Sequence, residues 1–150
     1  MSAALTVEGA RRRYGERVPV DGVELTLEAG RIHCLLGPSG CGKSTLLRLI
    51  AGLEPLDGGR IAAGGCTLSG PGVHVPPEVR GVGFVFQDYA LFPHLRVADN
   101  VGFGLRRIAA AERRAKVATQ LERVRLADRS GAYPQMLSGG EQQRIALARA

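Results

Sequence analysis

The run GPSGCGKST, residues 37–45, constrains the fold of this chain more than any other stretch of its sequence. It fits the pattern G-x-x-x-x-G-K-[ST]. Glycines at these positions let the backbone fold back so that successive N–H groups point into one hollow, and a helix that begins there adds partial positive charge. The run therefore predicts a loop that binds phosphate oxygens through its main chain.

The residues on either side of this loop support the prediction. Residues 32–36 are nearly all apolar, which is typical of a central strand covered on both faces. Residues 43–51 predict a helix, and Gly52 is placed as its C-terminal cap. We expect four apolar side chains of that helix to face inward: Leu46, Leu47, Leu49 and Ile50. A strand, a glycine-rich turn and a helix in this order indicate an α/β fold.

Two side chains of the loop bring chemistry of their own. Lys43 can carry a full positive charge to the β- and γ-phosphates of a nucleotide, and the hydroxyl of Ser44 can ligate Mg²⁺, which prefers oxygen ligands. The predicted nucleotide-binding residues of the loop are Gly37, Pro38, Ser39, Gly40, Cys41, Gly42, Lys43, Ser44 and Thr45. The alternative is a turn that only joins a strand to a helix, and the flanking elements argue against it.

The other segments divide the chain into an α/β front half and a helical back half. Residues 23–28 alternate apolar with polar, which favours a strand with one face on a core. A short strand is expected near residues 60–61, and the apolar residues 82–86 predict a second buried strand. The apolar spacing of an amphipathic helix follows at Val117, Leu121 and Val124.

Composition excludes several classes of protein. The net charge is +6, but the basic residues are scattered and no aromatic ladder interleaves them, so we expect no nucleic-acid partner. The uncharged apolar stretches fall far short of the roughly 20 residues that span a bilayer. Three cysteines without C-x-x-C spacing indicate neither a disulfide framework nor a zinc site.

A second glycine-rich helix start occupies residues 138–141, with the sequence SGGE. It predicts a capping box, in which the Ser138 hydroxyl accepts the N–H of Glu141 and the Glu141 carboxylate reaches back. Glycines at the start of a helix cost about 1 kcal/mol each relative to alanine, and a cap alone does not need Gly139 and Gly140. Bare N–H groups at this helix start suggest an anion nearby.

The phosphate loop followed by LSGGEQQRIALARA resembles the nucleotide-binding subunits of ATP-binding-cassette (ABC) transporters, whose signature motif is LSGGQ or close to it. Here Glu141 takes the place of the final glutamine. The resemblance implies the P-loop NTPase fold of an ABC cassette: a small antiparallel β part, a parallel core sheet and a helical subdomain. It also implies that the chain binds ATP with Mg²⁺ and hydrolyses ATP to power transport.

The same resemblance assigns roles outside the phosphate loop. It implies that Tyr14 stacks on adenine. It also implies that Lys43 and Gln87, the latter in FVFQD, are catalytic residues and that Ser44 and Gln87 are magnesium ligands. The signature residues would bind the nucleotide held by a second, head-to-tail cassette: Ser138, Gly139 and Gly140.

The resemblance further implies a membrane partner. In the family, the segment that begins at Gln87 and ends at Leu105, residues 87–105, receives a helix of the transmembrane permease. The sequence of this segment most resembles that of importers for iron(III), polyamines and related solutes. We therefore expect a cytoplasmic subunit, peripheral on the cytoplasmic face of the cell membrane.

The family's Walker B strand, catalytic glutamate and switch histidine are not found after the signature motif. The predicted helix is still marked by Ile145, Leu147 and Ala148 where the sequence stops. We therefore expect a partial cassette over residues 1–150, with an ATP-binding core over about 1–90 and a helical subdomain over about 91–150.

Two other functions stay open at this point. A small P-loop kinase would use Asp88 as its magnesium carboxylate, but it leaves the SGGE helix start without a role. A nucleotide-binding module that does not hydrolyse ATP would need the phosphate loop alone.

Overall fold

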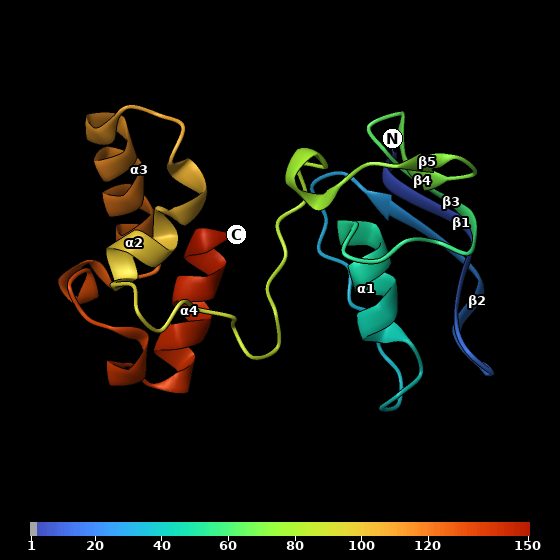
Figure 1. Ribbon diagram of the computed structural model, residues 1–150, viewed down its shortest axis with the longest axis horizontal. Helices are drawn as coiled ribbons and strands as arrows, with labels where there is room; N and C mark the ends of the chain where they lie inside the picture. Colours follow the sequence, from blue (N-terminus) through green and yellow to red (C-terminus); the bar gives the residue numbers. More distant parts are fainter. Residues whose placement is uncertain (1–2) are drawn as a thin grey trace. The chain divides into compact units, whose positions relative to one another are not determined.

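The computed structural model describes residues 3–150, which form two compact units that divide after Val82 (Figure 1). The first unit is a sheet with one α-helix, and the second is helical. Each has a hydrophobic core of its own. Nothing in residues 3–150 is both long and apolar enough, as a helix, to cross a membrane.

The first unit is built on a five-stranded sheet in the order β2-β1-β3-β4-β5. Its strands are β1 (Ala3–Tyr14), β2 (Arg17–Glu28), β3 (Gly58–Ala63), β4 (Cys66–Gly70) and β5 (Val73–His74). All four pairings are antiparallel. The strands predicted at residues 23–28 and 60–61 are confirmed, as parts of β2 and β3.

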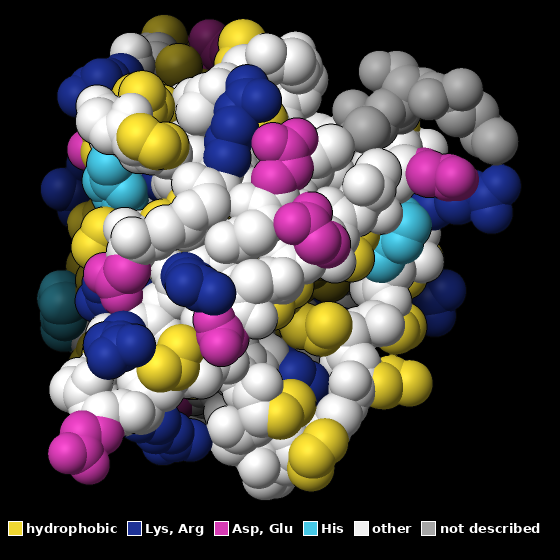
Figure 2. All heavy atoms as spheres, turned by 90° about the vertical axis from the view of Figure 1, so that its right-hand side faces the viewer, with side chains coloured by type: hydrophobic (Ala, Val, Ile, Leu, Met, Phe, Trp, Pro, Cys, Tyr) yellow, Lys and Arg dark blue, Asp and Glu magenta, His cyan; other side chains and the backbone are white. Residues whose placement is uncertain are grey.

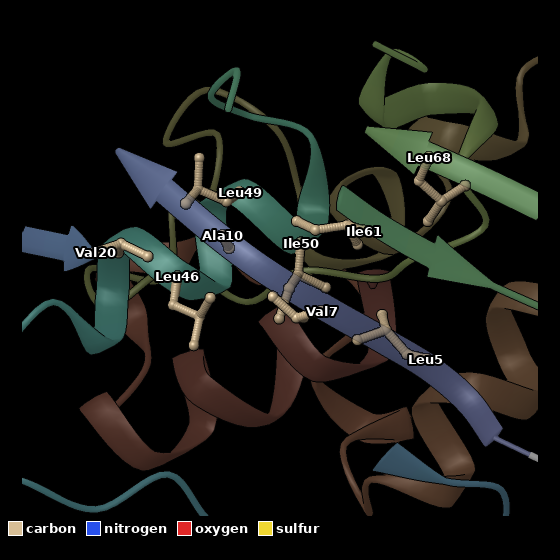
Figure 3. Packing of buried hydrophobic residues seen from close by; sticks show 9 residues of the cluster. All are labelled: Leu5, Val7, Ala10, Val20, Leu46, Leu49, Ile50, Ile61 and Leu68. Atoms are coloured by element: carbon tan, nitrogen blue, oxygen red, sulfur yellow. The ribbon is translucent and has the colours of Figure 1, made fainter. Parts of the chain in front are cut away.

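Helix α1 (Lys43–Ala51) packs its apolar face on this sheet. Figure 3 shows Leu46, Leu49 and Ile50 of α1 among buried side chains of the strands. Gly52 ends the helix in the left-handed conformation, with φ 79°, as predicted for a C-terminal cap. Leu47 does not face inward as predicted: its side chain is about half exposed, because it lies on the opposite side of the helix from Leu49.

The buried strand predicted at residues 32–36 is wrong. These residues form no strand, and Ile32 and Leu36 are 96% and 88% exposed. Cys34 is exposed as well. An apolar run becomes a central parallel strand only when other strands pair with both of its edges and helices cover both of its faces. Within residues 3–150 no strand pairs with this segment.

The strand predicted at residues 82–86 is also wrong, for the same physical reason. The segment has no regular secondary structure. Phe84 and Phe86 pack edge to face instead, with 4.8 Å between their ring centroids. The parallel core sheet that the resemblance implies is therefore not formed by the residues that the structure describes.

A buried arginine joins the end of α1 to the sheet. Arg80 is only 7% exposed, and its Nη1 donates to the carbonyls of Leu49 and Ile50 at 3.0 and 2.9 Å. Its Nε donates to the carbonyl of Val75 and its Nη2 to Oγ of Ser69, both at 2.6 Å. Burial lowers the pKa of the guanidinium. A cation at the C-terminus of a helix also interacts favourably with the helix dipole.

We predict that Arg80→Met destabilises this chain by about 3 kcal/mol, because it leaves several buried acceptors without a donor. Arg13→Met is the matched control, since the side chain of Arg13 is exposed and only its backbone N–H is hydrogen-bonded, to Asp57. Urea denaturation of the three proteins measures the effect. Equal unfolding free energies for the two variants would contradict this account of Arg80.

The second unit consists of helices around an apolar core. Its α-helices are α2 (Val97–Val101), α3 (Ala110–Arg123) and α4 (Gly139–Arg149), joined by the short 3₁₀ helices η2 (Phe103–Leu105), η3 (Ala127–Arg129) and η4 (Pro134–Met136). The buried side chains are Val97, Val101, Val117, Leu121, Leu126, Leu137 and Ile145. The amphipathic helix predicted from Val117 and Leu121 is confirmed as α3, and Val124 is its partly buried C-cap.

Helix α4 buries a different face from the one expected. Ile145 and Ala146 are buried, whereas Leu147 is 64% exposed. Leu147 follows Ile145 by two residues and so lies about 160° around the helix from it, and the two cannot share one narrow face. The helix therefore leaves a large apolar side chain on its surface.

Charged side chains of both signs are interspersed on the surface. Figure 2 shows basic and acidic groups next to one another on one face of the molecule. Exposed pairs include Arg11 with Asp21 at 2.8 Å and Arg31 with Glu28 at 2.7 Å. Such exposed pairs contribute little to stability.

Candidate functional site

The glycine-rich loop makes a close backbone contact with β2 at the start of α1. Gly42 is the N-cap of α1 and has φ 96°, a left-handed conformation that favours glycine. A Cβ atom at Gly42 would overlap the carbonyl oxygen of Pro19 in β2. Gly40, with φ 81°, is left-handed as well. The loop therefore needs glycine at residues 40 and 42.

Lys43 folds back over the loop that precedes it. Its Nζ donates to the carbonyls of Gly37 and Pro38 at 2.8 and 2.7 Å and lies 3.6 Å from Sγ of Cys41. No acidic residue lies in the first turn of α1. The ammonium group and the N-terminus of the helix therefore place positive charge at the same point, which favours an anion.

A hollow of about 160 Å³ opens between this loop and the first two strands. Its lining residues are Tyr14, Arg17, Pro19, Gly40, Gly42, Lys43, Ser44 and Thr45. Arg17 donates from Nη2 to the carbonyl of Gly40 at 3.1 Å, so a second cation lies at the rim. The structure thus brings together Tyr14 and the second half of the predicted loop.

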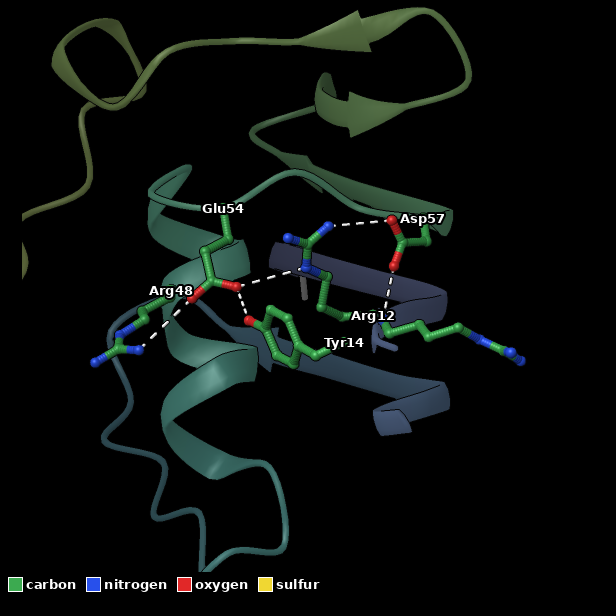
Figure 4. A network of polar contacts seen from close by, with 6 residues as sticks. Arg12, Tyr14, Arg48, Glu54 and Asp57 are labelled. Carbon is green, nitrogen blue, oxygen red and sulfur yellow. Dashed lines mark hydrogen bonds and ion pairs between the residues drawn. The ribbon is translucent and has the colours of Figure 1, made fainter. Parts of the chain in front are cut away.

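A polar network fixes Tyr14 at the edge of the hollow (Figure 4). Its hydroxyl donates to the carboxylate of Glu54, which also pairs with Arg12 at 3.5 Å and with Arg48 at 3.6 Å. Cζ of Arg12 lies 4.9 Å from the centre of the Tyr14 ring. Asp57 accepts from Nη1 of Arg12 at 3.1 Å. With one face near Arg12 and 43% of the residue exposed, the ring is held in place and accessible.

Ser44 fits the role of a magnesium ligand. It lies in the first turn of α1, lines the hollow beside Lys43 and is exposed. A hydroxyl oxygen is a suitable donor for this hard cation. Thr45 follows it in the lining, so both hydroxyl residues of the motif border the same space.

Gln87 and Asp88 belong to the second unit, whereas the phosphate loop belongs to the first. Both residues are exposed, in a turn that begins at residue 87. Asp88 does not end a buried strand, which is the placement that the kinase alternative requires. The backbone of the next two residues, Tyr89 and Ala90, is left-handed, with φ 62° and 45°.

The predicted capping box at the start of α4 is confirmed. Oγ of Ser138 accepts the N–H of Glu141 at 3.4 Å, and Oε2 of Glu141 accepts the N–H of Ser138 at 2.8 Å. The Ser138 hydroxyl also donates to that carboxylate at 2.7 Å. A Cβ at Gly139 or Gly140 would meet no described atom within 4 Å. Packing within the chain therefore does not require glycine there.

The capping box gives α4 a dependence on pH. Hydrogen bonds from the side chain and then the backbone of Ser138 lower the pKa of Glu141. The stability from these bonds is present above the unfolded-state pKa and is lost as the pH falls through the lower folded-state pKa.

We predict that Ser138→Ala is less stable than the parent at pH 7 and that the difference shrinks in acid.

Urea denaturation between pH 7 and pH 2 measures this difference. Gln143→Ala is the control, since Gln143 is exposed on the same helix and lies outside the capping box. A stability loss in Ser138→Ala that stays constant over this range would show that Glu141 does not depend on Ser138.

Sequence reasoning missed three residues that shape these segments. Arg17 lines the hollow, and Glu54 anchors Tyr14 at its edge. The local sequence does not identify either as a site residue, because their partners are distant in the chain. Asn100 is fully buried and accepts the N–H of Phe92 at 2.8 Å. Its Nδ2 donates to the carbonyls of Phe92 and Leu95 at 3.1 and 3.0 Å. The local sequence VADNV has two adjacent polar residues, Asp99 and Asn100, and does not show which of them is buried.

A phosphate loop at a helix N-terminus, a tyrosine at the rim of its hollow and a second glycine-rich helix start define a nucleotide-binding cassette. The sequence model of the ABC transporter family matches residues 20–150. The chain belongs to that family.

Curated relatives with similar sequences are named as import ATP-binding proteins. The chain is 51% identical over 151 residues to a spermidine/putrescine import ATP-binding protein of Methylococcus capsulatus. It is 50% identical over 152 residues to a sulfate/thiosulfate import ATP-binding protein of Mycobacterium bovis. The alignments include 99% and 100% of this chain but 38% and 42% of the relatives. The chain thus spans about two fifths of their length.

Solved structures with the same fold are ABC cassettes. One is a dimeric post-hydrolysis state of an ATP-binding cassette bound to ADP and Pi, with a TM-score of 0.83 and 29% sequence identity. Another is the dimeric structure of a bacterial ABC transporter cassette, with a TM-score of 0.81 and 27% identity. Each comparison covers 97% of this chain and 68% of the other chain. The predicted α/β cassette class is confirmed.

Proposed function

We propose that this chain binds ATP with Mg²⁺ and that the protein it belongs to hydrolyses ATP to power an ABC importer. The observation that carries this proposal is the pre-shaped loop at the start of α1, with Lys43 over it and Tyr14 at its rim. The identity to import ATP-binding proteins supports the direction of transport.

The residues of the loop divide the work of holding the nucleotide. Backbone N–H groups of residues 37–45 bind phosphate oxygens, and Lys43 exchanges the carbonyls of Gly37 and Pro38 for the β- and γ-phosphates. Tyr14 stacks on adenine. Ser44 and Gln87 hold Mg²⁺, which neutralises charge on the phosphates when bound.

Hydrolysis requires two copies of the cassette in this proposal. Ser138, Gly139 and Gly140 of one copy bind the γ-phosphate held by the loop of the other, and the open space at both glycines leaves room for that contact. The two solved relatives are dimeric, which supports the arrangement. Residues 1–90 act as the ATP-binding core and residues 91–150 as the helical subdomain.

The permease docks on residues 87–105, which places this subunit on the cytoplasmic face of the membrane. Phe92 and Phe103, whose ring centroids are 4.3 Å apart, offer apolar surface in that segment. The relatives carry names for import of polyamines and of sulfate or thiosulfate, so import and ATP binding are the properties that their names share. The placement of Asp88 in an exposed turn does not favour the kinase alternative.

We predict that Lys43→Ala weakens ATP binding by the complete gene product at least tenfold, because it removes the side-chain charge that we assign to the terminal phosphates. Lys116→Ala is the matched control, since Lys116 lies in α3 and pairs with Glu112 at 2.9 Å. Equilibrium binding of a fluorescent ATP analogue with Mg²⁺ measures both. Unchanged affinity in Lys43→Ala would overturn the assignment of the loop.

A further inference from the structure

The last turn of α4 is bonded to the turn that follows Gln87. Nη1 of Arg149 donates to the carbonyl of Ala90 at 2.7 Å, and Nη2 donates to the carbonyl of Tyr89 at 3.0 Å. These partners lie about 60 residues earlier in the chain but within the same compact unit. A planar guanidinium suits this two-pronged contact, because its N–H groups are held in a fixed fork.

The backbone that Arg149 holds is strained. Tyr89 and Ala90 are consecutive non-glycine residues with φ 62° and 45°. Residues with a Cβ rarely adopt this conformation, and they keep it only when surrounding contacts enforce it. Within the turn, the N–H of Tyr89 also donates to the carbonyl of Phe86 at 3.0 Å.

The hydrogen bonds of the Arg149 guanidinium go to these two carbonyls. It forms no salt bridge with any carboxylate in residues 3–150, and its Cζ lies 5.5 Å from the centre of the Phe92 ring. Burial lowers the pKa of its guanidinium. The chain therefore partly desolvates a cation when it binds these two backbone carbonyls, and this costs free energy unless both bonds form.

We propose that Arg149 is a positioning residue that fixes the turn at residues 87–90, and with it Gln87, relative to the signature helix. The proposal rests on the proposed function, in which Gln87 serves hydrolysis. Helix α4 begins at the signature glycines and ends at Arg149, about 15 Å away at 1.5 Å per residue. A rigid helix thus links the start that binds the partner's nucleotide to the turn that carries Gln87.

The test uses Arg149→Met in the complete gene product, assembled with its permease. We expect kcat for ATP hydrolysis to fall about tenfold while KM for ATP changes less than twofold, because the phosphate loop lies in the other unit. Hydrogen exchange at the amides of residues 88–91 should become faster. Arg144→Met, an exposed arginine on the same helix, should leave kcat and exchange unchanged.

Arg149→Lys separates positioning from general packing. A lysine keeps the charge and can reach one carbonyl but not two, so we expect a kcat between those of the parent and Arg149→Met. If Arg149→Met does not fold, the same reading of kcat and exchange is made on Arg149→Lys alone. A kcat of the variant equal to that of the parent, or a rise in KM by the same factor as the fall in kcat, would overturn the proposal.

A double-variant cycle with Ala90→Gly tests the role of strain. Glycine adopts φ 45° without penalty, so the turn should depend less on Arg149 in that background. We expect Arg149→Met to reduce kcat by a smaller factor in Ala90→Gly than in the parent. Equal factors would contradict the link between Arg149 and the strained turn. Loss of ATP binding in Lys43→Ala is measured separately, so failure of this proposal leaves the proposed function standing.

Discussion

The close approach of Gly42 to the carbonyl of Pro19 is the contact on which the proposed nucleotide site depends. It sets where α1 begins relative to β2, and no side chain fits between them. Because α1 is fixed there, its N–H groups and Lys43 point into the hollow that Tyr14 borders. The buried face of α1 on the antiparallel sheet then holds this geometry in place.

Both units use a partly desolvated arginine to bind main-chain carbonyls near a helix end. Arg80 binds the carbonyls of Leu49 and Ile50 at the C-terminus of α1, and Arg149 binds those of Tyr89 and Ala90 from the last turn of α4. The first contact secures the helix that carries the phosphate loop. The second secures the turn after Gln87. In each case the arginine joins segments that are far apart in the sequence, so its removal affects two elements at once.

Local patterns predicted the elements whose partners are near in sequence. The capping box at Ser138, the C-cap at Gly52 and the helix from residue 43 were all predicted, because their hydrogen bonds lie within a few residues. The strands predicted at residues 32–36 and 82–86 are absent, because an apolar run favours burial but does not supply the neighbouring strands and helices that provide it. Leu47 and Leu147 were wrongly predicted to face the core, because an apolar side chain does not by itself show which face of its helix is covered.

The sequence by itself determined the family of this protein, through the order of glycines, lysine and hydroxyl residues in 37–45 and the SGGE helix start. Such motifs work through backbone groups that are local, so their spacing is enough. Only the tertiary structure decided that Glu54 anchors Tyr14, that Asn100 shapes the loop at Phe92, and that Arg149 holds the turn after Gln87. Those contacts join residues that only folding brings together, and no local pattern records them.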